Sequence, residues 1–189
     1  MNHRYLQKFQ IKDVVFLAIM SAVALATCAV MPLVISLQPL IFGISQLVTA
    51  LQIGVFFAIG LYKVRKPGSL LLMALMMGLI QLMMSPPMFL SSVLNGVLIE
   101  LIVLLLFRGY ARDAAVFVAA MLHTPLSLPF NYLYNRLIKG ADSPLAAVAD
   151  RAPLAAVGMM LAVVAVSALG ALIGIKIARE LKKSGVLKK

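Results

Sequence analysis

Residues 88–107 read MFLSSVLNGVLIELIVLLLF, twenty residues that carry a single formal charge, on Glu100. A helix of about 20 apolar residues crosses a hydrocarbon core of roughly 30 Å, so this stretch predicts a membrane span. The rest of the chain has the same character, since 63% of its 189 residues are apolar and 12% are charged. Soluble domains average about 45–50% apolar and 25% charged residues. These proportions exclude most soluble folds.

Six apolar stretches of this kind predict an all-α integral membrane protein, a bundle of six transmembrane helices that forms one domain over residues 1–189. The third stretch is short and ends at Ser85-Pro86-Pro87, where two helix breakers predict a tight turn into the fourth. The expected spans are Val14–Ile35, Leu40–Tyr62, Gly68–Met84, Met88–Phe107, Ala114–Tyr134 and Pro153–Ile177.

The distribution of positive charge predicts the topology. A formal net charge of +11 occurs in nucleic-acid binders as well as in membrane proteins. Here the Lys and Arg residues form short clusters between long uncharged stretches, so nucleic acid is not expected as a partner. Most of these residues lie at the two termini and in the second and fourth loops, which share one side of a six-span bundle. By the positive-inside rule both termini are expected to be cytoplasmic.

Polar side chains recur at helical spacing in four of the expected spans and predict a small-molecule cavity. A polar residue within a membrane is costly, so it usually faces protein or a cavity. Most of these residues fall in the outer half of the expected bundle, where four spans would converge on a site open to the exterior. The candidate substrate-binding residues are Gln46, Thr49, Gln81, Ser91, Ser92, Asn95, Glu100, His123, Ser127, Asn131 and Tyr132.

Several of these features have a structural alternative to ligand contact. Glu100 is the only formal charge deep within a span, and it is either a hydrogen-bonded carboxyl that ties helices together or a ligand-recognition group. Pro125 and Pro129 remove two backbone donors from the fifth span, which gives either a plain kink or a ligand wall with free carbonyls. A lone histidine such as His123 bridges helices more often than it binds a metal, and no metal-ligand spacing is present.

Alanines recur at intervals of four in the first span, at Ala18, Ala22 and Ala26, and predict a smooth face for close helix packing. Together with the turn Lys63-Val-Arg-Lys-Pro-Gly-Ser-Leu and the helix Asn95-Gly-Val-Leu-Ile-Glu100, this pattern resembles the S component of energy-coupling factor (ECF) transporters. S components are the substrate-binding membrane subunits of these importers. The resemblance covers essentially the whole chain. It is nearest to small S components linked to thiamin or its hydroxymethylpyrimidine precursor and to related ones whose substrates are unassigned.

The resemblance implies a high-affinity binding subunit of an ECF-type ABC importer in a prokaryotic cell membrane, without enzymatic activity of its own. The alanine face would contact a transmembrane scaffold subunit, the T component, which is driven by two cytoplasmic ABC ATPases. Substrate capture on the outer side is implied for the loop Ser36–Ile41 and for the outer ends of the last three spans. The other expected partners are the small-molecule substrate and the lipid bilayer.

The implied substrate is a vitamin, a vitamin precursor or a related cofactor, carried as cargo and not as a catalytic cofactor. A thiamin-pathway pyrimidine suits the carboxyl group of Glu100. The chain has no Trp, however, and this weakens the thiamin assignment, because a cationic aromatic ligand normally stacks on an aromatic ring. A haem or cobalamin-like tetrapyrrole suits the Met-rich segments and His123. Two other classes stay open. One is a small secondary transporter acting as a dimer; the other is an intramembrane enzyme, which would need converging catalytic groups that no motif here supplies.

Overall fold

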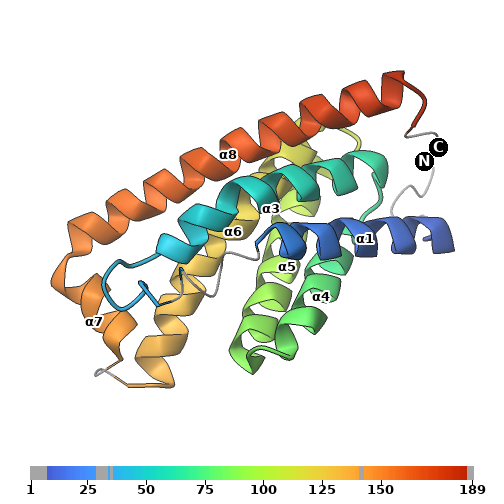
Figure 1. Ribbon diagram of the computed structural model, residues 1–189. Coiled ribbons are helices and arrows are strands. Elements are labelled where there is room, and N and C mark those ends of the chain that lie inside the picture. The colour runs from blue at the N-terminus through green and yellow to red at the C-terminus, as the bar shows by residue number, and fades with distance from the viewer. Residues whose placement is uncertain (1–7, 29–33, 35, 141–142, 187–189) are drawn as a thin grey trace.

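The computed structural model describes residues 8–28, 34, 36–140 and 143–186. Within these residues helices are the only regular secondary structure, as predicted, and there is no strand. Figure 1 shows the helices gathered into one bundle, with the long α8 along one side. The helices are α1 (Ile11–Thr27), α3 (Ile44–Lys63), α4 (Ser69–Leu82), α5 (Pro86–Phe107), α6 (Asp113–Leu137), α7 (Pro144–Arg151) and α8 (Pro153–Lys183).

Four helices, α3, α5, α6 and α8, are long and apolar enough to cross a membrane. Helix α4 is apolar but has 14 residues, and α1 has 17. The helix predicted over Val14–Ile35 ends at Thr27, and residues 29–33 and 35 of that range lie outside the described residues. The count of six spans and the orientation of the termini stay predictions.

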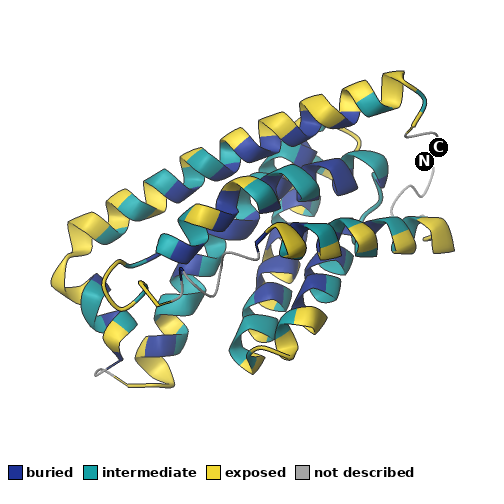
Figure 2. Ribbon diagram, viewed as in Figure 1, coloured by how far each residue is buried: buried dark blue, intermediate teal, exposed yellow. Residues whose placement is uncertain are grey.

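The outer surface of the bundle is apolar. Helix α8 is strongly apolar, yet only 22% of its most apolar stretch of 18 residues is buried. Figure 2 shows α8 largely in the colours of exposed and half-buried residues. Leu105 on α5 is 81% exposed and Leu154 on α8 is 88% exposed. A helix that is apolar on its exposed side as well as its buried side is typical of a membrane span. This surface is therefore suited to lipid contact.

Helix α8 packs against α3 through a Gly-x-x-x-Gly pair that the sequence interpretation did not use. A Cβ atom on Gly170 would lie 2.4 Å from the backbone oxygen of Leu51, and one on Gly174 would lie 2.4 Å from that of Val55. Real Cβ contacts are essentially never this short, so glycine permits the two helix backbones to approach closely. This packing fixes α3, which carries one wall of the cavity described below.

Serine hydroxyls join further helix pairs by donating to backbone carbonyls. Ser92 Oγ on α5 donates to the carbonyl of Ala74 on α4 at 2.8 Å, and Ser21 Oγ on α1 donates to the carbonyl of Met73 at 3.2 Å. A small residue supports the first of these contacts, since a Cβ on Gly96 would lie 2.6 Å from the Cβ of Ala74. Helices α4 and α5 therefore form a tight antiparallel pair connected by the turn at Ser85.

The two prolines of α6 do not interrupt the helix. Pro125 has no N–H, so the carbonyl of Met121 loses its usual partner one turn later. Ser167 Oγ on α8 donates to that carbonyl at 2.8 Å. Ser127 Oγ donates to the carbonyl of Thr124 at 2.6 Å within α6. The first of these contacts ties α6 to α8, a structural role for the proline that the sequence did not reveal.

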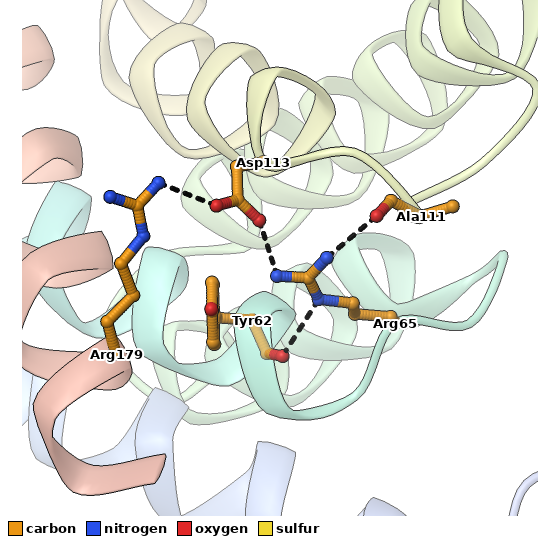
Figure 3. A network of polar contacts seen from close by, with 5 residues as sticks. All are labelled: Tyr62, Arg65, Ala111, Asp113 and Arg179. Atoms are coloured by element: carbon orange, nitrogen blue, oxygen red, sulfur yellow. Dashed lines mark hydrogen bonds and ion pairs between the residues drawn. The ribbon is translucent and has the colours of Figure 1, made fainter. Parts of the chain in front are cut away.

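Ion pairs join the helices at the end of the bundle where α3 ends and α6 begins. Asp113 accepts from Arg65 at 2.5 Å and from Arg179 on α8 at 2.7 Å (Figure 3). Arg65 also donates to the carbonyl of Ala111 at 2.7 Å and to that of Tyr62 at 3.3 Å. One carboxylate thus connects the ends of α3, α6 and α8.

Candidate functional site

A cavity of about 1020 Å³ lies among α1, α3, α4, α5 and α6 and the start of α7. Its residues come from the first half of α3, the last half of α4, the first half of α5 and the last half of α6. The cavity therefore occupies the end of the bundle away from the Arg65–Asp113–Arg179 network. Its volume is at the upper end of the range typical of small-molecule sites, about 300–1,000 Å³.

Nine of the eleven predicted substrate-binding residues line this one cavity, although they come from four different helices. The two that do not are Glu100 and Tyr132. The nine are Gln46, Thr49, Gln81, Ser91, Ser92, Asn95, His123, Ser127 and Asn131.

Further polar residues line the cavity that the sequence interpretation did not select. Ser45, Thr124 and Asn135 share helical stripes with selected residues, so the same spacing points to them as well. Lys139 and Ser143 lie beyond the predicted fifth span, and nothing in the periodicity pointed to them. They reach the cavity because α6 continues to Leu137 and the short α7 folds back beside it.

Several polar groups of the cavity wall are paired with one another. Ser45 Oγ donates to Gln46 Oε1 at 2.8 Å, and Thr49 Oγ1 donates to the carbonyl of Ser45 at 2.9 Å. Asn135 Nδ2 donates to Asn131 Oδ1 at 2.9 Å. These bonds hold parts of the wall formed by α3 and α6 in a fixed arrangement.

Three buried lining residues differ, because they carry polar atoms without a hydrogen-bond partner among the described residues. The atoms are Asn95 Oδ1, both ring nitrogens of His123 and Thr124 Oγ1. The residues are 1%, 4% and 3% exposed, respectively. An unpaired buried polar group costs about 1–3 kcal/mol. We call Asn95, His123 and Thr124 the inner polar trio.

The cavity is poor in charge and rich in sulfur and hydrocarbon. Lys139 carries the one formal charge among the described lining residues, and its side chain is exposed, with Nζ 5.9 Å from the ring centroid of Tyr134. The apolar part of the wall includes Ile53 and the methionines at 77, 84 and 88. No group of three or more His, Cys, Asp or Glu residues gathers as metal ligands within the described residues.

Glu100 on α5 lies outside the cavity, and its carboxylate reaches the start of α4. Its carboxylate accepts from the backbone N–H of Gly68 at 2.6 Å and from the hydroxyl of Tyr110 at 2.8 Å, and the residue is 6% exposed. Burial, followed by the charge and hydrogen bond of Glu100, raises the pKa of Tyr110. Both carboxylate oxygens therefore accept hydrogen bonds from within the chain. Of the two interpretations of Glu100, this arrangement matches the carboxyl that ties helices together and not the ligand-recognition group.

Tyr132 points to a different partner. Its hydroxyl donates to Asp150 on α7 at 2.7 Å, and Arg136 donates to the other oxygen of the same carboxylate at 2.6 Å. This cluster joins the last turns of α6 to α7.

The predicted alanine face of α1 is open on its outer side. Ala22 and Ala26 are exposed and also line the cavity, whereas Ala18 is half-buried and does not line it. The opposite face of α1 is packed in the bundle through Leu17, Ser21 and Ala24. Ala22 and Ala26 thus lie on the side of α1 that is not packed against other helices, at the cavity.

Comparison with known proteins gives one family. A family model described as a hypothetical bacterial integral membrane protein (Trep_Strep) matches residues 11–183, from the start of α1 to the end of α8. No curated protein and no solved structure matches the chain.

Proposed function

We propose that this chain, a member of the Trep_Strep family of bacterial integral membrane proteins, is the substrate-binding subunit of an ECF-type importer. The observation that carries the proposal is the cavity of about 1020 Å³ on which nine predicted polar residues from four helices converge. The proposed cargo is a vitamin, a vitamin precursor or a related cofactor. The cargo would be bound and released without chemical change.

The position of the cavity supports capture from outside the cell. The basic clusters gather at the end of the bundle that holds Arg65 and Arg179, and the cavity lies toward the other end. Under the positive-inside rule the basic end is cytoplasmic, so the cavity lies in the outer half of the membrane. Both termini would then be cytoplasmic in a six-span protein.

The open alanine face supports an assembly with other subunits. Ala22 and Ala26 present only methyl groups on an exposed side of α1, which allows close approach of a partner helix. We propose that this face contacts a transmembrane scaffold subunit and that two ABC ATPases supply the energy, so that the chain itself has no enzymatic role. A secondary transporter is less well supported, because no carboxylate lies among the described residues of the cavity wall.

Copurification tests the proposal. The tagged protein is purified in mild detergent from membranes of the bacterium that encodes it. We expect a second membrane subunit and ATPase subunits to accompany the wild type. Ala22→Leu should lose both, because its larger side chain separates the helices, whereas Ala165→Leu on the exposed side of α8 should keep them. Absence of ATPases from the wild-type preparation, or their retention by Ala22→Leu, would contradict the proposed assembly.

A further inference from the structure

We infer that the ligand enters the cavity with an uncharged, hydrogen-bonding end innermost, an amide or an amino-substituted nitrogen heterocycle, which binds to Asn95, His123 and Thr124. The inference rests on the proposed function, since it names the class of molecule that the same cavity takes. Four unpaired polar atoms on these three residues carry it.

The unpaired state is confined to one part of the cavity wall. The other buried polar lining residues donate hydrogen bonds within the chain, as Ser92 does to the carbonyl of Ala74 at 2.8 Å and Ser143 to Asn135 Oδ1 at 3.0 Å. The one other buried side-chain atom without a partner among the described residues, Ser69 Oγ, lies at the start of α4, outside the cavity. The inner polar trio is therefore a distinct feature of the wall and not a general shortage of partners.

The chemistry of the trio defines what it can bind. Asn95 Oδ1 is an acceptor, the hydroxyl of Thr124 both donates and accepts, and a neutral imidazole such as His123 offers one donor and one acceptor. A ligand that satisfies all of them must present both donors and acceptors within a small area. Amides and amino-substituted nitrogen heterocycles have this combination, whereas a hydrocarbon or an ether does not.

The charges of the cavity wall disfavour a charged ligand group beside the inner polar trio. A buried charge without a partner is strongly unfavourable. No carboxylate lies among the described lining residues that would balance a cation, and both oxygens of Glu100 bind elsewhere. The one lining cation, Lys139, is exposed, so it does not neutralise an anion beside the trio.

The surroundings of the trio add apolar surface to its polar groups. The ring of His123 lies against Phe57 on α3, with centroids 4.4 Å apart and the planes inclined by 47°. This contact holds the imidazole in place from the side of the core. Ile53, one turn before Phe57, and Met77 on α4 add buried apolar surface to the wall. Apolar surface beside a few fixed polar groups is typical of small-molecule recognition.

Three fragments of nearly one shape test the charge preference. Nicotinamide is uncharged, nicotinate is an anion and 1-methylnicotinamide is a cation. Their binding to the full chain in detergent is measured by saturation-transfer NMR. We expect nicotinamide to bind about tenfold or more tightly than either charged fragment. Asn95→Leu and Thr124→Val should each weaken nicotinamide binding by about tenfold.

The matched control for Thr124→Val is Thr27→Val. Thr27 Oγ1 donates to the carbonyl of Ala24 at 2.8 Å at the end of α1, and the residue does not line the cavity. This variant should bind nicotinamide like the wild type. Failure of nicotinamide to bind, equal or tighter binding of 1-methylnicotinamide, or full retention of binding by Asn95→Leu would overturn the inference.

Thermal unfolding of the protein without added ligand provides a second readout. If Asn95 Oδ1 is reserved for a ligand, Asn95→Leu removes an unpaired buried atom and should raise the unfolding temperature by about 2–4 °C. A fall in the unfolding temperature would show that Asn95 stabilises the fold, and it would overturn the inference. The copurification test does not depend on these fragments. A protein that assembles with ATPases but prefers the cationic fragment would refute only the ligand class.

Discussion

The carboxylate of Glu100 on α5 accepts a hydrogen bond of 2.6 Å from the backbone N–H of Gly68, 32 residues earlier in the chain. Gly68 precedes α4 and has a φ of 88°, a left-handed conformation that glycine adopts without strain. A negative charge at the start of a helix is favourable because it faces the positive end of the helix dipole. The one acid deep in a predicted span thus stabilises the start of a neighbouring helix.

We therefore expect Glu100 to affect stability more than ligand binding. Glu100→Ala leaves the N–H of Gly68 and the hydroxyl of Tyr110 without their acceptor, and should lower the free energy of unfolding by about 2–4 kcal/mol. Thermal unfolding in detergent measures this. The control is Glu180→Ala, since Glu180 pairs with Lys183 on the exposed end of α8 and such pairs contribute little. Weaker binding of nicotinamide at unchanged stability would instead place Glu100 in ligand recognition.

Gly170 should tolerate no larger side chain. Because a Cβ atom there would lie 2.4 Å from the carbonyl oxygen of Leu51, Gly170→Ala must separate α3 from α8, at a cost of about 1–3 kcal/mol. Gly158 on the same helix is the matched control, since nothing lies within 4 Å of its added Cβ. Gly158→Ala should be neutral or stabilising by up to about 1 kcal/mol. Equal effects of the two substitutions on the unfolding temperature would refute this packing.

Ser167 and Pro125 should be coupled through the carbonyl of Met121. Ser167→Ala alone removes the donor to that carbonyl and should destabilise the protein by about 1–3 kcal/mol. Pro125→Ala restores an N–H that can donate to the same carbonyl within α6. In a double-mutant cycle, Ser167→Ala should therefore cost less in the Pro125→Ala background. Additive effects would mean that the two residues act independently.

The pH dependence of stability should include a contribution from Asp13. Burial opposes ionisation of this carboxylate, but hydrogen bonds from Lys66 at 2.6 Å and from the N–H of Gln10 at 3.0 Å, with the charges of Lys66 and Lys12, outweigh it and lower the pKa. A lowered folded-state pKa gives stability that is present above the unfolded value, about 3.9, and lost as pH falls through the folded value.

The test compares the wild type with Asp13→Asn. The unfolding temperature of the wild type should exceed that of the variant at pH 7. The difference should begin to shrink as the pH falls below about 4, and it should disappear once the pH is below the lowered folded-state pKa of Asp13. A difference that stays constant over this range would show that the charge of Asp13 does not contribute.

Helical periodicity predicted the cavity better than it predicted the role of any single residue. Ser91, Asn95 and Asn131 line the cavity because spacing of four residues places polar groups on one face of a helix, a local property that the sequence contains. Glu100 has the same spacing from Gly96, yet it turns to Gly68, a contact between residues 32 positions apart. The spacing of residues along α5 carries no information about Gly68, which lies in the loop before α4.

The sequence also did not predict which side chain would donate to the backbone carbonyl that Pro125 leaves without a partner. The prolines of α6 were visible, but Ser167 lies 46 residues from Met121 and no local pattern connects them. The predicted first span also continues past the end of α1 at Thr27, because the apolar composition continues there. Hydropathy depends on composition alone and does not respond to where a helix ends.

Native mass spectrometry of the protein purified from its own bacterial membranes tests the central claim, that the cavity holds a small molecule, most directly. We expect a bound small molecule on the wild type. Ser91→Trp, which fills the cavity, should lack it, and Leu105→Trp, which adds the same ring to the 81% exposed side of the same helix, should retain it. A wild-type protein without a bound molecule, or a Ser91→Trp variant that retains one at the wild-type level, would contradict the account.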